Sequence, residues 1–417
     1  MRDHEKLLVK VKTSDHIPGL DGIRAIAFLM VYFSHMGLGR SYTGGQGVAF
    51  FFFLSGYLIT TLMRKESNST GTISIFEFYV RRFFRIIPPL YVTVLLAILL
   101  HLARLDPALS FRGVVSAVLY YSNFYMLHHG GMGGLGATWS LSIEEHYYFA
   151  FPFIYLLTIR LGRKAQSRIL AVICIAILLW RCYLSYWAHV PLKRIYMYTD
   201  TRVDLIFLGA ILALTINPVF DAIPAWFRKR PRLYGTCGAV SALAVDHIPI
   251  VKDGLSYTLI GLSLFPVFWF VISYSHDRLT RWLESALLRT IGRWSYSLYL
   301  VHSIVIDTIK LTTHLSSTAS SLLAIGPCLI FAWAVEKFVE KPSYRLRNFI
   351  ITRIRKKRVH IVTDDAGAVA SGAPYSWRKV PAKSVPAGMR QTDTEESWND
   401  ARTVVPAELG SEHVVAD

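Results

Sequence analysis

The sequence places ionisable side chains inside apolar stretches, where an unpaired charge costs several kcal/mol. Arg24 and His35 lie in one such stretch, about three helical turns or 16 Å apart. Both side chains are therefore expected on one face of a helix, with His35 near the outer end. An imidazole placed there suits general-base catalysis. The alternative is structural, with Arg24 extending to the inner interface and His35 lying at the outer one.

Two adjacent carboxylates, Glu144 and Glu145, begin another apolar stretch. A carboxylate at this depth is expected to orient His35, as general-base catalysis requires. The alternative is a helix N-terminus stabilised by negative charge. Adjacent helical residues point about 100° apart, so only one of the two glutamates is expected to face the interior, and the sequence leaves open which.

A third candidate group is Arg82 and Arg85, which stand just before Pro88 and Pro89. Three residues apart, the two arginines share a helix face. Guanidinium groups match phosphate oxygens in geometry and charge, so the pair would bind a phosphate-rich donor from the cytosol. The alternative is ordinary cationic anchoring on the cytoplasmic side of a membrane.

Other ionisable residues carry weaker signals. Arg202 and Asp204 are close enough in sequence to pair with each other. His302 lies in the middle of an apolar stretch, where packing and lining of a pore are equally expected. The four cysteines form no CxxC motif, and no metal site is expected.

The elements that must position these residues are membrane helices. Of 417 residues, 53% are hydrophobic and only 18% charged, and the mean hydropathy is +0.37. This composition favours an all-α, polytopic membrane protein over a soluble enzyme. A span needs about 20 apolar residues, and stretches of roughly that length run over 17–37, 46–63, 86–104, 143–161, 168–188, 202–217, 233–249, 255–273, 293–311 and 320–340.

Basic residues predict the topology, since they collect on the cytoplasmic side. The net charge of +17 is concentrated in six clusters, around residues 2–12, 64–85, 160–168, 228–232, 278–293 and 353–358. All six fall inside if the shorter stretch 113–127 does not cross. We therefore expect ten spans in the cytoplasmic (inner) membrane, both termini in the cytoplasm, and a re-entrant hairpin over 113–142 on the outer side.

Three regions follow from this topology. Residues 1–16 are predicted to form a cytoplasmic segment, 17–348 the membrane domain, and 349–417 a basic and then disordered cytoplasmic tail. We attribute the net positive charge to the placement of basic residues on the cytoplasmic side of the membrane. Nucleic-acid binding is not expected, because the sequence has no stripe of exposed basic and aromatic residues.

Taken together, these residues resemble the acyltransferase-3 family of integral membrane O-acyltransferases. The resemblance covers about residues 17–348, and its motifs come in the family's order. They are Leu20-Asp21-Gly22-Ile23-Arg24-Ala25 with the spacing to His35, the Phe-rich run 48–59 that ends in Ser55-Gly56-Tyr57-Leu58-Ile59, Arg82-x-x-Arg85, Trp139-Ser140-Leu141-Ser142-Ile143-Glu144-Glu145-His146-Tyr147-Tyr148, and Ser295-Tyr296-Ser297-Leu298-Tyr299-Leu300-Val301-His302.

The resemblance implies ten core spans and transfer of an acyl group, expected to be acetyl, from cytosolic acyl-CoA. Acceptors in the family are carbohydrates, glycolipids and, in some members, macrolides. By resemblance His35 is the catalytic base, Arg24 its motif partner and Glu144 the carboxylate of the Trp-Ser-Leu motif. Arg82 and Arg85 are expected near the CoA phosphates.

Two departures from the family pattern matter. Ala49 stands where the family often has Asp, and the chain ends in a polar tail without the hydrolase-like domain of many members. Transfer is therefore expected to finish in the membrane domain or with a separate partner. Ser55, Tyr57 or a nearby backbone N–H are the expected oxyanion donors.

Two other classes of function stay open. A transporter or flippase of a lipid-linked or small polar substrate also needs buried polar residues in a bundle of many spans. A structural or signalling membrane protein would tolerate substitution of Arg24, His35 and Glu144.

Overall fold

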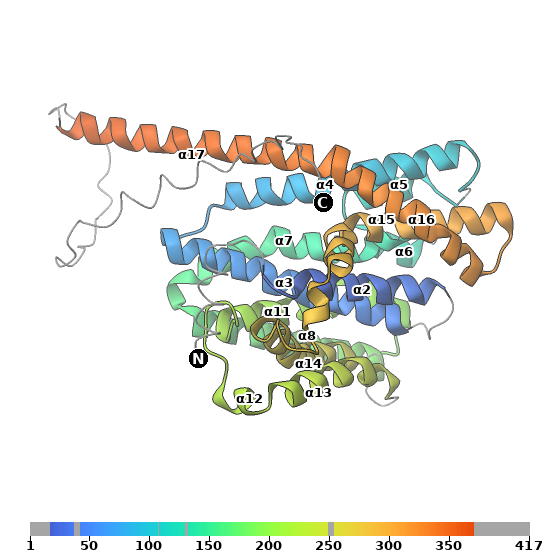
Figure 1. Cartoon of the computed structure of the whole chain (residues 1–417), viewed down its shortest axis with the longest axis horizontal. Coiled ribbons are helices and arrows are strands. Elements are labelled where there is room, and N and C mark those ends of the chain that lie inside the picture. The colour runs from blue at the N-terminus through green and yellow to red at the C-terminus, as the bar shows by residue number, and fades with distance from the viewer. Residues whose placement is uncertain (1–16, 37–41, 107, 130–131, 249–253, 371–417) are drawn as a thin grey trace, which may run out of the picture. The chain divides into compact units, whose positions relative to one another are not determined.

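The computed structural model describes residues 17–36, 42–106, 108–129, 132–248 and 254–370. Within these residues every regular element is a helix, apart from an isolated bridge between Met132 and Gly134. The chain divides into two compact units, 1–356 and 357–417. The helices that carry the candidate residues lie in the first unit (Figure 1).

Each of the longer helices up to residue 335 overlaps one of the predicted apolar stretches. They are α2 Leu20–His35, α3 Tyr42–Thr70, α4 Ile75–Leu102, α7 Thr138–Thr158, α8 Arg163–Cys182, α11 Asp204–Thr215, α13 Pro231–Ala244, α14 Ser256–Ser273, α15 Ala286–Thr313 and α16 Ser317–Val335. Of these, α3, α4 and α15 extend well beyond their predicted stretches.

Short helices and turns connect these elements. They are α5 Phe111–Val118, α6 Ser122–His128, η1 Leu135–Ala137, η2 Ile159–Leu161, η3 Tyr183–Trp187, α9 Leu192–Met197, α10 Thr199–Arg202, α12 Ala225–Lys229, η4 Val245–His247, η5 Arg281–Glu284 and η6 Glu336–Glu340.

The structure confirms the predicted fold class, an all-α protein with several helices that could cross a membrane. Among the described residues, five helices are long and apolar enough to cross a membrane: Gly44–Thr70, Ile75–Leu102, Arg163–Trp187, Ser256–Ser273 and Ser317–Arg355. The count of ten spans and the re-entrant hairpin stay predictions.

Helix α3 is central to the packing, because it contacts both α11 and α2, and α2 in turn contacts α15. The contact with α11 depends on two glycines. A Cβ at Gly56 would collide with the carbonyl oxygen of Ile206, and one at Gly209 with that of Phe53. These residues let the two backbones meet without intervening side chains, as small residues do between membrane helices.

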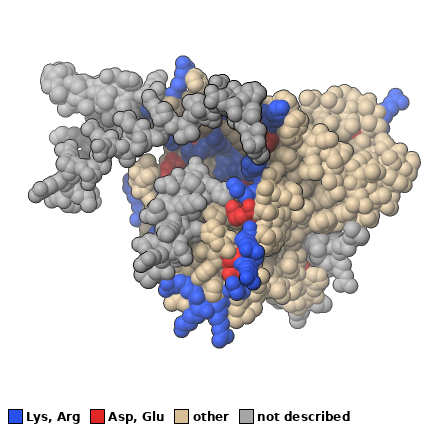
Figure 2. Space-filling view, in the orientation of Figure 1, with Lys and Arg blue, Asp and Glu red and all other residues tan. Residues whose placement is uncertain are grey.

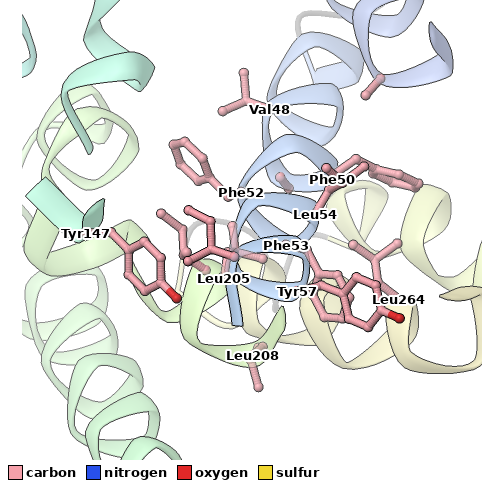
Figure 3. Packing of buried hydrophobic residues seen from close by; sticks show 14 of the residues in the cluster. Val48, Phe50, Phe52, Phe53, Leu54, Tyr57, Tyr147, Leu205, Leu208 and Leu264 are labelled. Atoms are coloured by element: carbon pink, nitrogen blue, oxygen red, sulfur yellow. The ribbon is translucent and has the colours of Figure 1, made fainter. Parts of the chain in front are cut away.

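Aromatic side chains on opposite sides of α3 fill the core. Figure 3 shows Phe53 and Tyr57 on the side that faces Leu264 of α14, and Phe52 on the other side, toward Tyr147 of α7. The ring centroids of Phe53 and Tyr57 lie 4.7 and 5.3 Å from that of Phe268. Edge-to-face pairs at such distances stabilise the packing beyond the contribution from burial of their apolar area. Helix α3 therefore has a fixed rotation, which determines the direction of its polar residues.

Helix α17, Lys341–Ala370, crosses the predicted boundary between membrane domain and tail at residue 348 without a break. The predicted cytoplasmic segment 1–16 and residues 371–417 of the predicted tail lie outside the described residues.

Candidate functional site

A cavity opens between α2, α3, α4, α7 and α15, with about 810 Å³ of empty space including the part open to solvent. One part of its wall is apolar and aromatic, and another carries most of the predicted site residues. The polar and tyrosine side chains of the lining are Arg24, Ser55, Arg82, Arg85, Ser140, Glu144, Tyr148, Ser295, Tyr296 and Tyr299.

Three guanidinium groups and one carboxylate line this cavity, and the carboxylate interacts electrostatically with two of the guanidinium groups, Arg82 and Arg85. Arg82 and Arg85 both line the cavity, as their spacing on one face of α4 predicts. Arg24 reaches it from α2 and forms an ion pair of 3.2 Å with Asp21, one turn earlier. Since Arg24 and Arg85 repel each other electrostatically, the cavity suits an anionic ligand that neutralises the excess cationic charge.

Arg82 is held by aromatic rings rather than by acids. Its guanidinium carbon lies 5.4 Å from the ring centroid of Tyr148 and 5.7 Å from that of Phe78. Its Nε is buried and has no hydrogen-bond partner among the described residues. Cation–π contacts of this kind position the guanidinium and leave its N–H donors available.

Of the two adjacent glutamates, Glu144 lines the cavity and Glu145 does not. The Tyr148 hydroxyl donates a hydrogen bond of 2.9 Å to Glu144 Oε2 and lies 3.0 Å from Ser55 Oγ. Glu144 and Tyr148 are four residues apart on α7, so they share a face. Glu145 Oε1 is buried without a hydrogen-bond partner in the described part of the chain. The sequence had left this choice open.

His35, the last residue of α2, is not part of the lining. Its ring centroid lies 4.9 Å from that of His302 on α15, in an edge contact. His302 is fully buried, and its Nδ1 is 2.7 Å from the carbonyl oxygen of Tyr299. That bond places the proton on Nδ1, because a carbonyl oxygen only accepts.

Tyr299 lines the cavity and links it, through ring contacts, to His302 and His35. Its ring centroid lies 5.5 Å from that of His302, and its hydroxyl lies 2.6 Å from Ser140 Oγ. The order from the cavity outward is therefore Tyr299, His302 and His35. The structure brings Arg24, Arg82, Arg85 and Glu144 together around one cavity, and in it Glu144 contacts Tyr148 rather than His35.

Tyr148, Tyr296 and Tyr299 belong to the motifs quoted from the sequence but were assigned no role there, although two of them carry a spacing signal. Tyr148 follows Glu144 by one helical turn, and Tyr299 precedes His302 by slightly less than one. Tyr57, a predicted oxyanion donor, hydrogen-bonds to Asn217 Oδ1 at 2.8 Å and does not line the cavity. Ser55, the other one named, does line it.

The predicted pairing of Arg202 with Asp204 is wrong. Asp204 is bound by Arg181 of α8, whose Nη1 lies 3.0 Å from both carboxylate oxygens, and both side chains are fully buried. Arg181 reaches Asp204 through the packing of α8 on α11, a contact between residues distant in sequence. Among the described residues, no group of three or more His, Cys, Asp and Glu side chains is arranged to hold a metal ion.

Comparison with known proteins adds an independent observation. A family model described as an acyltransferase domain matches residues 17–337. The peptidoglycan O-acetyltransferase OatA of Listeria monocytogenes is 27% identical over 361 residues, which cover 80% of this chain and 57% of that protein. The O-acetyltransferase OatA of Staphylococcus aureus is 29% identical over 378 residues, 84% of this chain and 59% of that protein.

The chain therefore spans less than three fifths of the length of these curated relatives. No solved structure matches it significantly.

Proposed function

Because the chain belongs to the acyltransferase-3 family, we propose that it is a membrane O-acyltransferase that moves an acyl group, preferentially acetyl, from cytosolic acyl-CoA to a hydroxyl of a carbohydrate or glycolipid. The observation that carries this proposal is the cavity lined by Arg24, Arg82, Arg85 and Glu144. A macrolide is the other acceptor of this kind that the family resemblance allows.

The proposed topology has ten spans in the cytoplasmic membrane and both termini inside. Helices α5 and α6 have 8 and 7 residues, or about 10–12 Å at 1.5 Å per residue, and a bilayer core of about 30 Å is too thick for either. This supports a hairpin over 113–142 that does not cross. Figure 2 shows Lys and Arg side chains gathered over one part of the face in view, while the opposite end is almost free of charge, as a cytoplasmic side requires.

The donor is proposed to bind with its phosphates against Arg82 and Arg85, with Arg24 nearby. Guanidinium groups form charge-assisted hydrogen bonds with phosphate, and three of them in one cavity match a ligand with several negative charges. The pantetheine arm, roughly 15 Å long, would then extend along the aromatic part of the cavity and bring the thioester toward Tyr299.

The acceptor hydroxyl is proposed to arrive from the outer side and to lose its proton to His35. Its oxygen attacks the thioester carbonyl, the carbon–sulfur bond breaks, and the CoA thiolate leaves and takes up a proton from the imidazolium. Ser55 of the lining is the proposed oxyanion donor. Glu144 is proposed to act in the cavity by holding Tyr148 beside Arg82.

This mechanism needs a path between His35 and the cavity. Ring contacts link Tyr299 of the lining to His302 and His302 to His35, so the proposal includes a movement of both Tyr299 and His302 when the acceptor binds, in which Tyr299 loses its contact with Ser140. Movement of two side chains is a small change for an enzyme that admits two substrates from opposite sides.

The test uses the full chain in proteoliposomes with radiolabelled acetyl-CoA on the cytosolic side. Label appearing on an O-acyl ester of the acceptor supports the proposal. Movement of an unmodified solute across the membrane, with no acetyl ester formed, would instead assign the chain to transport, the rival class. Mass spectrometry of surface glycans with and without the gene identifies the acceptor.

A further inference from the structure

Arg202, the last residue of α10, is a buried cation whose guanidinium has no hydrogen-bond partner within the described part of the chain. Its side chain is 0% exposed, and Nε, Nη1 and Nη2 all lack a partner among the described residues. Buried charges in proteins are normally paired, because removing one from water costs several kcal/mol. The five N–H donors of this guanidinium are therefore available to a ligand.

The acids near Arg202 do not neutralise it. Asp204 is fully engaged by Arg181 Nη1 and by Thr258, whose hydroxyl donates to Oδ2 at 2.6 Å. Asp246 interacts with Arg202 electrostatically, but no ion pair joins the two side chains in the part of the chain that the structure describes. An incoming anion would therefore meet an arginine that no acid contacts.

Aromatic rings surround this guanidinium on several sides. Its central carbon lies 3.7 Å from the ring centroid of Tyr257, 5.1 Å from that of Tyr196 and 5.7 Å from that of Phe52. Trp139 lies against Tyr196, with ring centroids 4.7 Å apart. Cation–π contacts offset part of the desolvation cost, and rings beside one well-placed polar group are typical of small-ligand sites.

The cage adjoins the cavity through a shared ring. Phe52 lines the cavity and also lies over Arg202, and Arg202 acts electrostatically on Tyr299, another residue of the lining. In the proposed topology α11 begins on the outer side of the membrane, directly after α10. Arg202 therefore lies on the side from which the acceptor arrives.

We propose that Arg202 and its ring cage form an acceptor subsite that binds an anionic group, a carboxylate or a phosphate, carried by the glycan beside the hydroxyl that is acylated. This inference rests on the proposed function, because the bound glycan is an acceptor only if the protein is an acyltransferase. The guanidinium fork binds the two oxygens of the anion, and the rings of Trp139 and Tyr196 pack on the apolar face of the sugar.

The test measures the melting temperature of the full chain in detergent with three probes: trigalacturonate, which carries carboxylates, a glycerol phosphate trimer, and neutral maltotriose. At saturation, either anionic probe is expected to raise the melting temperature by roughly 5 °C more than maltotriose. Arg202→Met is expected to abolish that difference and Arg202→Lys to reduce it, because lysine keeps the charge but loses the fork.

A matched control is Arg194→Met, which is expected to keep the full response. Arg194 also stacks on a tyrosine, with 3.9 Å to the Tyr198 ring centroid, but its guanidinium is bound by both carboxylate oxygens of Asp200. Without ligand, Arg202→Met should melt at or above the wild-type temperature, since loss of an unpaired buried charge is neutral or stabilising.

Two outcomes overturn the inference: no anionic probe shifts the wild type more than maltotriose does, or Arg202→Met retains the shift. The probe that acts distinguishes a carboxylate from a phosphate. Failure of the proposed function is seen separately, as absence of acetyl transfer from acetyl-CoA by a protein that still shows the Arg202-dependent shift.

Discussion

Replacing Arg82 by methionine tests whether the cavity binds the acyl donor. The guanidinium of Arg82 lies over Tyr148 and Phe78, and its Nε has no hydrogen-bond partner in the described structure. Methionine keeps the length and apolar contacts of the side chain but cannot bind phosphate. The substitution therefore removes a ligand contact without breaking any ion pair among the described residues, although Glu145 loses its electrostatic interaction with Arg82.

The size of the effect follows from that environment. A hydrogen bond to a charged group contributes about 1.5–3 kcal/mol, so loss of one guanidinium–phosphate contact should raise the Kd for acetyl-CoA about 10- to 150-fold. The thermal stability of the protein should change little, because no ion pair in the described part of the chain is broken.

The neighbouring Arg81 provides the matched control. It pairs with Glu66 at 2.7 Å and Glu77 at 3.1 Å and does not line the cavity. Isothermal titration of acetyl-CoA into the full chain in nanodiscs should show a Kd within about twofold of wild type for Arg81→Met. A wild-type Kd for Arg82→Met, or equal weakening by both substitutions, would refute the assignment of the cavity to the donor.

Three further predictions concern base, core and pH. His35→Ala should abolish acetyl transfer while membrane insertion and the Kd for acetyl-CoA stay at wild-type values, and retained transfer would exclude His35 as the base. Arg181→Met should lower unfolding stability by about 3–5 kcal/mol, seen as a large loss in melting temperature, because it leaves Asp204 buried and unpaired. Burial opposes the charged form of Asp221, yet hydrogen bonds from Arg64 and from the Asn217 N–H hold the pKa of Asp221 below its usual value. Its contribution to stability is thus present above about pH 4 and is lost as the pH falls through the lowered pKa. The stability gap between wild type and Asp221→Asn should accordingly be full at pH 7 and shrink in acid, and a gap that does not change with pH would contradict this.

Local spacing predicted the part of the site that lies on single helices. Arg82 and Arg85 share a face of α4 because residues three apart on a helix lie on the same side. Packing of α4 against its neighbours then determines that this face points toward the cavity. The same reasoning predicted that one of two adjacent glutamates faces inward. It did not predict which, because the rotation of α7 is determined by packing, with Tyr148 meeting Ser55 of α3.

Neighbours around the bundle could not be predicted in this way. Hydropathy and charge indicate how deep a residue lies in a membrane, but not which helix it meets at that depth. Glu144 was expected beside His35 on grounds of depth, yet it meets Tyr148 while His35 meets His302 of α15. Asp204 was expected to pair with the nearest cation in sequence, and a helix more than 20 residues away supplied Arg181 instead.

The separation of His35 from the cavity bears on how the proposed enzyme would avoid wasting its donor. A base in open contact with the thioester would activate water as readily as an acceptor hydroxyl, and each such event hydrolyses acyl-CoA. In the structure the Tyr299 hydroxyl lies 2.6 Å from Ser140 Oγ in the cavity lining, and His302 lies in ring contact with both Tyr299 and His35. Under the proposed mechanism His35 meets the thioester only after Tyr299 and His302 have moved. Acceptor binding is then the event that assembles the catalytic groups, a form of induced fit in which binding energy of the correct acceptor brings about the rearrangement.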